Sequence, residues 1–336
     1  MNALKPDIDI IADSLLAIIR KRPGAAYQFD ALCKNLDIDH DVLSDALQKL
    51  ASWDYKISVR KSEGVTFLDA PDSLTATEIT YNLKTSFVGR TCHSYRTVKS
   101  TNDLASQIAE SGSPASEGTI ITSEEQTKGR GRLGRSWHSP FGTGIYLSII
   151  LKPRFAPERA PGISIMTALA LAKTLEPYSP GDIQIKWPND VLINGKKTAG
   201  ILTELSAERN KINCLVVGVG INVNQGVENF PEELRNSATS LRRALKHKVR
   251  RVPLLQSFLV HFEKEYLIYQ KHDLTKSHAR LKRYSSLLGH DVKILSGSHI
   301  TSGKAIDIDS RGCLILKQTD GTRVAISAGE VSVVKE

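Results

Sequence analysis

The sequence predicts an α+β protein built from an N-terminal winged helix-turn-helix, a central mixed β-sheet with helices, and a small C-terminal β-barrel. Residues 1–70 contain three helical periodicities followed by two short β patterns. From Arg90 onward strands alternate with helices, and the last 50 residues are rich in β patterns separated by regularly spaced turns. A chain of 336 residues is long enough for two or three domains.

The N-terminal region is expected to form helices over residues 8–20, 29–36 and 41–53. Pro23-Gly24 ends the first helix, and Asp39 is a suitable N-cap for the third. Two short β runs flank Ser62-Glu63-Gly64, which predicts a hairpin in the position of a wing. We therefore expect residues 1–70 to be the winged helix-turn-helix domain and residues 71–84 to be a connector.

The central region, residues 85–275, alternates between β and α patterns. Strands are expected over residues 118–122, 144–151, 183–187 and 214–223, and helices over residues 103–110, 163–175 and 254–269. The run CLVVGVGINV at 214–223 is almost continuously apolar, so it is expected to be buried on both faces of the sheet. Asn194-Gly195 predicts a tight hairpin turn.

The C-terminal region, residues 286–336, is expected to form the small barrel. Its turns are predicted at Gly297, Gly303, Arg311-Gly312 and Asp320-Gly321, and this even spacing of short strands is typical of such folds.

The composition excludes several classes of protein. Apolar residues make up 40% of the chain and charged residues 24%, which is ordinary globular usage. No apolar run is long enough to span a membrane, and Asp7, Asp9 and Asp13 interrupt the N-terminal stretch where a signal peptide would be apolar. Four single cysteines, without a CxxC pair, predict neither a disulfide framework nor a metal site: Cys33, Cys92, Cys214 and Cys313. We expect a reduced, cytoplasmic protein.

The formal charge of +9 is unevenly distributed. Residues 1–70 contain 9 Lys and Arg against 11 Asp and Glu, a net of −2, which leaves +11 for the rest of the chain. Such an excess suits nucleic acid, an acidic protein partner or phosphorylated substrates.

A glycine-arginine segment is the first candidate for chemistry. Gly129 to Gly134 formally matches GxGxxG, but a strand rather than a helix follows, so the dinucleotide-binding context is absent. Arg130, Arg132 and Arg135 lie among the three glycines, and guanidinium groups on a flexible backbone suit a phosphate or a carboxylate. Trp137, just beyond, is either a core residue or an aromatic platform for a base.

The second candidate is Lys186-Trp187-Pro188-Asn189-Asp190, where the chain leaves a predicted strand. Polar groups at such a position commonly bind ligands. Lys196 and Lys197 follow the hairpin turn, and because neighbours on a strand point to opposite faces, at most one of them faces a site. Gly218 and Gly220 permit a ligand to approach the buried strand closely.

In this order and spacing the segments resemble one family, the biotin–protein ligases of the bifunctional kind that also repress biotin operons. The segments are STN at Ser100–Asn102, QTKGRGR at 126–132, WHSP at 137–140, KWPND at 186–190, KTAGILTEL at 197–205 and GVGINVN at 218–224. The resemblance implies a class II synthetase-like ligase core.

The resemblance also implies a role for each matching residue. The biotin-binding residues would be Ser100, Thr101, Asn102, Gln126, Arg130, Gly131, Arg132 and Lys197. The residues that bind ATP or the adenylate would be Arg130, Arg132, Arg135, Trp137, Asn189, Lys197 and Asn222. Lys197, Arg132 and Asp190 would be catalytic, with Asp190 orienting the acceptor lysine.

Members of this family consume ATP with Mg²⁺, make biotinyl-5′-AMP, and pass biotin to a lysine of the biotin carboxyl carrier protein of acetyl-CoA carboxylase. The resemblance further implies a homodimer and operator DNA as a partner, with no membrane and no metal bound by the chain itself. Two alternatives are a lipoate–protein ligase, and a ligand-sensing DNA-binding regulator without ligase activity.

Charge leaves DNA binding by the N-terminal region open, with a structural or autoregulatory vestige as the alternative. The helix-turn-helix would begin at Phe29 and end at Gln48, and its second helix starts with the carboxylates of Asp39, Asp41 and Asp45. Binding to phosphates ordinarily relies on Lys and Arg. The cations available on this helix and the wing are Lys49, Lys56, Arg60 and Lys61.

Overall fold

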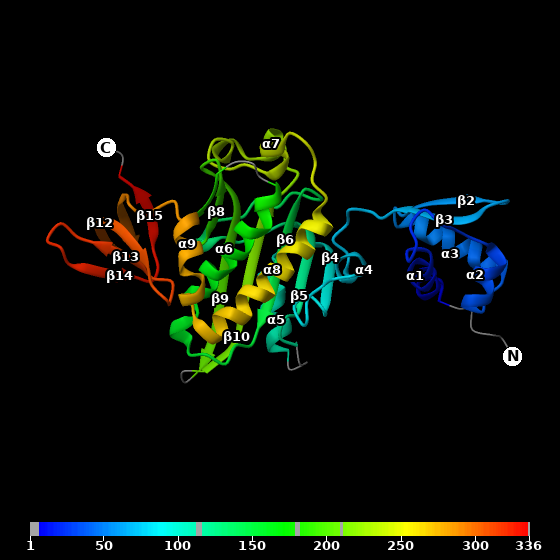
Figure 1. Ribbon diagram of the computed structural model, residues 1–336, viewed down its shortest axis with the longest axis horizontal. Helices are drawn as coiled ribbons and strands as arrows, with labels where there is room; N and C mark the ends of the chain where they lie inside the picture. Colours follow the sequence, from blue (N-terminus) through cyan, green and yellow to red (C-terminus); the bar gives the residue numbers. More distant parts are fainter. Residues whose placement is uncertain (1–6, 112–115, 179–181, 209–210, 335–336) are drawn as a thin grey trace. The chain divides into compact units, whose positions relative to one another are not determined.

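The computed structural model describes residues 7–111, 116–178, 182–208 and 211–334. The chain divides into two compact units, Met1–Asp72 and Ser73–Glu336 (Figure 1). Each unit has its own core.

The first unit contains three helices and a three-stranded sheet in the order β1-β3-β2. The elements are α1 (Ile8–Ile19), β1 (Ala26–Tyr27), α2 (Phe29–Leu36), α3 (His40–Ser52), β2 (Lys56–Arg60) and β3 (Gly64–Asp69). Asp39 caps α3 by accepting a hydrogen bond of 2.8 Å from the Val42 N–H, and Leu15, Leu32 and Leu43 are buried in the core. The three predicted helices and the hairpin are confirmed. The short strand β1 was not expected.

The second unit is built on a seven-stranded sheet in the order β4-β5-β6-β10-β9-β8-β7. The strands are β4 (Cys92–Val98), β5 (Ile120–Gln126), β6 (Gly144–Leu151), β7 (Ile183–Lys186), β8 (Asp190–Ile193), β9 (Lys196–Glu208) and β10 (Lys211–Asn222). β4 pairs with β5 in parallel and the other pairs are antiparallel, so the expected mixed sheet is confirmed.

Helices cover both faces of this sheet (Figure 1). On one face, Ala105 of α5 (Thr101–Glu110) packs in a cluster with Ile121, Ile150 and Val216. On the other, α6 (Pro161–Leu175) and α8 (Arg251–His272) contribute to the main core. β10 is therefore buried on both faces, as its apolar sequence predicts. Asn194 and Gly195 adopt φ of 50° and 71° and join β8 to β9, which confirms the hairpin turn.

The remaining helices of the second unit are short. They are α4 (Ala76–Thr80), α7 (Leu241–Leu245) and α9 (His278–Tyr284), with 3-10 turns at Arg132–Gly134, Pro157–Arg159, Glu176–Tyr178, Val227–Asn229, Glu232–Leu234 and Thr275–Ser277. Glu265 of α8 is fully buried and binds Lys173 of α6 at 2.6 Å and Arg280 of α9 at 2.7 Å, so it ties three helices together.

The segment 71–84 is not simply a connector. It contains α4, and its side chains Leu74, Ile79 and Leu83 are buried in the core of the second unit. The buried residues Leu74, Ile79 and Leu83 do not recur with a single helical or strand period, so the sequence alone did not indicate a packed segment.

The C-terminal strands form a five-stranded antiparallel sheet in the order β14-β13-β12-β11-β15. They are β11 (Asp291–Ser296), β12 (His299–Ile308), β13 (Leu314–Lys317), β14 (Arg323–Ile326) and β15 (Glu330–Val333). Among the described residues no pairing joins β14 to β15, so the expected barrel is not closed. Gly303 lies inside β12 rather than at a turn, where it pairs with Val292. The Lys317 carbonyl oxygen lies 2.7 Å from where a Cβ would stand, so the close approach of the neighbouring strand explains the glycine.

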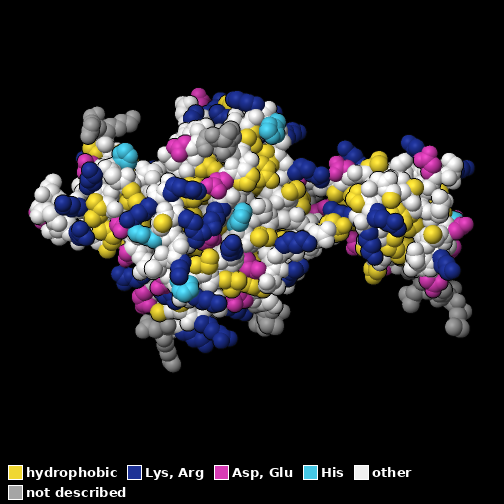
Figure 2. All heavy atoms as spheres, in the orientation of Figure 1, with side chains coloured by type: hydrophobic (Ala, Val, Ile, Leu, Met, Phe, Trp, Pro, Cys, Tyr) yellow, Lys and Arg dark blue, Asp and Glu magenta, His cyan; other side chains and the backbone are white. Residues whose placement is uncertain are grey.

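Two further expectations concern the chain as a whole. The four cysteines are free thiols, and burial raises the pKa of Cys92 to about 12. Within the part of the chain that the structure describes, no helix is long and apolar enough to cross a membrane. Lys and Arg side chains are scattered over the visible face of the second unit rather than gathered at one place (Figure 2).

Candidate functional site

Two adjoining cavities lie on the second unit, with volumes of about 50 and about 580 Å³. Five residues line both of them: Gly131, Arg132, Trp137, Asn189 and Lys197. The smaller cavity is also lined by Ser100, Thr101, Asn102, Gln126 and Arg130, and the larger by Arg135, Asp190 and Asn222. The structure thus brings together every residue that the sequence proposes for a small-molecule site.

The N-terminus of α5 forms one wall of the smaller cavity. Ser100 caps the helix, and Thr101 donates to Gln126 Oε1 from its N–H at 2.8 Å and from its hydroxyl at 3.1 Å. Asn102 lies against Gly218 of β10, where a Cβ would stand only 2.2 Å from Asn102 Oδ1. The glycine is therefore needed for this wall to close.

Ser148 lines neither cavity but supports this wall from behind, and the sequence did not indicate it. It is fully buried on β6, and its hydroxyl lies 2.6 Å from Asn102 Oδ1 and 2.8 Å from Thr101 Oγ1. The available signal was one hydroxyl within the apolar run GIYLSIIL, which we interpreted only as a core strand.

Each arginine of the segment 129–135 is held by a protein acceptor. Arg130 lies 2.7 Å from both Asp103 Oδ1 and Glu204 Oε2. Arg132 donates to Asn189 Oδ1 at 2.9 Å and to the Gly329 carbonyl at 3.4 Å. The third, Arg135, is paired with Glu330.

Arg132 is the most enclosed of the three. Burial lowers the pKa of its guanidinium, while the negative charges of Asp190 and Glu330 act in the opposite direction. A guanidinium stays protonated in proteins even when it is partly buried, so Arg132 brings a fixed positive charge to the boundary of the two cavities.

Lys197 supplies the second fixed cation. Its Nζ lies 2.7 Å from Asp190 Oδ1 and 5.4 Å from the centre of the Trp137 ring. Lys197 lines both cavities and Lys196 lines neither, which agrees with the opposite facing of neighbours on a strand.

Trp137 lies across two strands of the sheet. A Cβ on Gly220 would stand 2.3 Å from its Nε1, and one on Gly200 would stand 2.8 Å from its Cζ3. The indole is half-buried and faces both cavities, so the arrangement favours a platform over a core residue. Trp187 differs, because it is buried and donates its Nε1 to the Gly312 carbonyl at 2.8 Å.

The C-terminal sheet also contributes to the larger cavity, through Gly329, Glu330 and Val331. Lys186 and the apolar residues Phe230, Leu234 and Ala238 are also among its lining residues. Lys186 belongs to the KWPND segment, whereas the sequence did not indicate the other six residues, because they come from distant segments that carry no motif. Among the described residues no cluster of three or more His, Cys, Asp or Glu could hold a metal ion.

Comparison with known proteins gives consistent matches. The model of the biotin/lipoate A/B protein ligase family matches residues 94–222, and that of the biotin protein ligase C-terminal domain matches residues 287–334. The bifunctional ligase/repressor BirA of Bacillus spizizenii is 36% identical over 84% of this chain and 86% of its own length. The protein of the same description from Escherichia coli is 26% identical over 92% and 94%. A solved biotin protein ligase from Aquifex aeolicus, in complex with biotin and ATP, matches with a TM-score of 0.62 and 29% identity, over 74% of this chain and 100% of that one.

Proposed function

The chain belongs to the biotin protein ligase family, and from this premise we propose that its smaller cavity binds biotin and its larger cavity binds ATP. The observation that carries this division is that Arg132 and Lys197 line both cavities. A biotin ligase must bring a carboxylate and an α-phosphate together, and two fixed cations at the shared boundary lower the repulsion between them.

In the first step a carboxylate oxygen of biotin forms a bond to the α-phosphorus of ATP. The bond between the α-phosphorus and the oxygen that bridges the α- and β-phosphates breaks. Pyrophosphate leaves and biotinyl-5′-AMP remains. Arg132 and Lys197 donate to the oxygens on which negative charge increases, and holding both reactants in one site makes the step effectively unimolecular. In this scheme Trp137 stacks on the adenine, with Asn189 and Asn222 beside it.

The smaller cavity must widen to admit a bicyclic acid, since its volume is about 50 Å³. The contacts that would yield are the ion pairs of Arg130 with Asp103 and Glu204, because a ligand carboxylate can replace either one. Ser100, Thr101, Asn102 and Gln126 then remain to bind the polar ring of biotin.

In the second step the amine of a carrier lysine attacks the biotinyl carbonyl and AMP leaves. Asp190 lines the larger cavity and contacts Lys197, and in this scheme it orients the incoming ammonium and accepts a proton. The acceptor we propose is a lysine of a biotin carboxyl carrier protein. In this scheme the glycine-arginine segment 129–135 covers the adenylate until the carrier arrives and protects the anhydride from water.

Magnesium is proposed to enter with the nucleotide. Mg²⁺ in nucleotide sites is typically bound by substrate phosphates and one or two carboxylates, and the described residues offer Asp190 and Glu330 in the larger cavity rather than a cage of their own. Bound there, the ion would neutralise phosphate charge.

The proposal is tested by incubating the protein with ATP, Mg²⁺, biotin and a carrier domain, and measuring the carrier by mass spectrometry. We expect one biotin on one lysine, and biotin-dependent exchange of pyrophosphate into ATP. Lipoate is the matched alternative acid, and exchange that depends on lipoate rather than biotin would assign the cavities to the other branch of the family.

A second function, operator binding by the first unit, is favoured by the order of its elements. Helices α2 and α3 precede the β2–β3 hairpin, as in a winged helix-turn-helix, and the relative from Bacillus spizizenii is described as a ligase/repressor. Two of the candidate cations are paired within the unit, however: Lys49 lies 2.8 Å from Asp9, and Arg60 lies 2.8 Å from Glu63. Lys56 and Lys61 would then supply the phosphate contacts.

We propose that an adenylate-bound homodimer places one α3 helix in each half of a two-fold operator. A gel shift on the upstream region of the chain's own biotin operon should show binding that requires biotin and ATP and weakens steeply with salt. The absence of any such shift at low salt would limit the function to ligation.

A further inference from the structure

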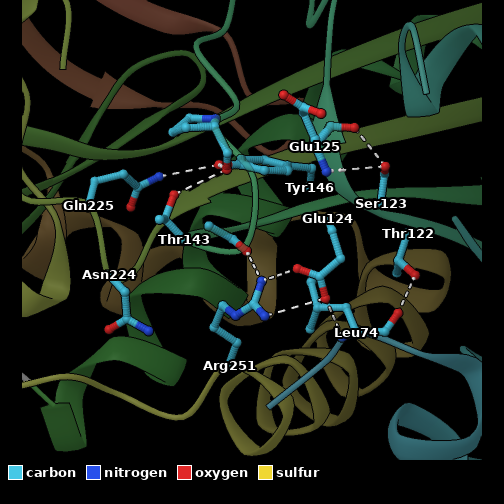
Figure 3. Close-up of polar contacts among 12 residues, drawn as sticks. Leu74, Thr122, Ser123, Glu124, Glu125, Thr143, Tyr146, Asn224, Gln225 and Arg251 are labelled. Atoms are coloured by element: carbon cyan, nitrogen blue, oxygen red, sulfur yellow. Dashed lines mark hydrogen bonds and ion pairs between the residues drawn. The ribbon is translucent and has the colours of Figure 1, made fainter. Parts of the chain in front are cut away.

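A buried chain of polar side chains runs from Pro140 to Asn222 beside the larger cavity. Tyr146 donates from its hydroxyl to the Pro140 carbonyl at 3.0 Å, and Gln225 donates from Nε2 to the Tyr146 hydroxyl at 3.4 Å and to Asn222 Oδ1 at 3.4 Å. Figure 3 shows Gln225 and Tyr146 pointing toward one another. Tyr146 and Gln225 are fully buried and Asn222 is 4% exposed, so solvent does not compete for these contacts.

The donors and acceptors in this chain fix the orientation of Asn222. The Nε2 group of Gln225 can only donate, so Asn222 must turn its oxygen toward Gln225 and its NH2 group away. Asn222 lines the larger cavity, and within the described residues its Nδ2 has no hydrogen-bond partner. The side chain therefore offers a donor to whatever occupies that cavity.

Gln225 holds this arrangement at a cost. Its Oε1 is buried and has no partner among the described residues, and a buried, unpaired amide oxygen destabilises the folded state. The position is otherwise well anchored. Ser240 donates its hydroxyl to the Gln225 carbonyl at 2.6 Å, and Gly144 leaves room for Tyr146, whose hydroxyl would lie 2.5 Å from a Cβ there. Unsatisfied groups held by rigid surroundings are typical of functional sites.

We propose that Gln225 and Tyr146 are positioning residues that hold the Asn222 amide with its NH2 toward the larger cavity, so that the site selects a nucleobase with a hydrogen-bond acceptor at that edge. This rests on the proposed function, in which that cavity binds ATP. Tyr146 also anchors Pro140, which ends the WHSP segment that begins with Trp137. The Tyr146 hydroxyl thus links the end of the WHSP segment to the Gln225 side chain that contacts Asn222.

The test is Gln225→Met, which removes the donor without adding charge. We expect the KM for ATP to rise about tenfold, the size of one lost hydrogen bond between neutral groups, with kcat and the KM for biotin within about twofold of wild type. The assay is biotin-dependent pyrophosphate exchange. Gln184→Met is the matched control, because Gln184 on β7 lines neither cavity, and it should leave all three constants unchanged.

A second readout separates positioning from general damage to the cavity. The wild type should lose about tenfold in affinity for one of 1-deaza-ATP and 7-deaza-ATP, each of which lacks a ring-nitrogen acceptor. In Gln225→Met that penalty should fall below about twofold, because Asn222 no longer presents a fixed donor.

An unchanged KM for ATP in Gln225→Met, or an analogue penalty equal in variant and wild type, would overturn the proposal. If Gln225→Met does not fold, Tyr146→Phe decides by the same readouts. It keeps the ring and removes the hydroxyl, and is expected to raise the KM for ATP about threefold. A wild type without biotin-dependent exchange would instead contradict the proposed function, so the two failures are distinguishable.

Discussion

Replacing Lys197 with Ala tests the placement of charge at the boundary of the two cavities. The substitution removes an ammonium group that lies 2.7 Å from Asp190 and lines both cavities. Two unit charges at about 4 Å interact by about 4 kcal/mol at the effective dielectric constant of a protein surface, and water that enters the gap recovers part of this. We therefore expect a loss of about 3 kcal/mol of transition-state stabilisation, or about 150-fold in the rate of adenylate formation.

The same substitution should hardly change the stability of the fold. The side chains of Lys197 and Asp190 are 35% and 20% exposed, and ion pairs that reach solvent typically contribute less than about 1 kcal/mol. Pyrophosphate exchange at saturating ATP and biotin measures the chemical step, and thermal unfolding of the same samples measures stability. A large effect on the first with a small effect on the second is the expected result.

Lys196→Ala is the matched control, because it removes the same side chain one position earlier, outside both cavities. Its exchange rate should stay within about twofold of wild type. Equal losses at the two positions would refute the argument from opposite facing, and a loss below about fivefold at Lys197 would refute its role at the boundary.

Three further predictions concern other parts of the second unit. Arg132→Gly removes the guanidinium between the cavities, so biotinyl-adenylate should escape and label a bystander protein without a carrier motif; labelling no higher than with wild type would count against retention. Glu124 lies 2.5 Å from Arg251 and its side chain is 13% exposed, so Arg251→Met leaves a largely buried carboxylate without its cation. The free energy of unfolding, measured in urea, should fall by about 3 kcal/mol, and adding Glu124→Gln should recover part of this loss. At Glu265, burial raises the pKa, but hydrogen bonds and charges from Lys173 and Arg280 lower it by more, so the pKa lies below the ordinary 4.5. The unfolded chain then binds more protons than the folded one, so the contribution of Glu265 to the free energy of unfolding is present above pH 4.5 and is lost as the pH falls through the folded pKa. In Glu265→Gln, the free energy of unfolding measured in urea should therefore depend less on pH between about pH 6 and about pH 3.

Features set by local chemistry could be predicted from the sequence. Asp39 caps α3 because a short carboxylate can reach the free N–H groups of the first turn. Asn194-Gly195 forms a tight turn because both residues tolerate positive φ. The strand β10 was recognised from its continuous apolar run. Each of these depends on residues close together in the chain.

Features set by distant contacts could not be predicted. The Gly329 carbonyl binds Arg132 across 197 positions, and no local pattern marks it as a ligand. Gly303 shows a different limit. Glycine serves turns and close backbone contacts alike, and only the neighbouring strand reveals that Lys317 requires it. Candidate residues could thus be named from motifs, while their protein partners depended on the fold.

Those partners explain how a strongly cationic site can exist before any substrate binds. Each of the cations Arg130, Arg135 and Lys197 lies against a protein carboxylate, and Arg132 donates to neutral oxygens while two carboxylates act on it through space. Without these acids, positive charges around one cavity would repel one another and destabilise the fold. When a ligand anion binds, it replaces a protein carboxylate beside the same cation, so the net gain in binding free energy in the ground state is small. Under the proposed function the gain would be largest where negative charge is greatest, at the α-phosphate during transfer, so this pairing would direct binding energy toward the transition state.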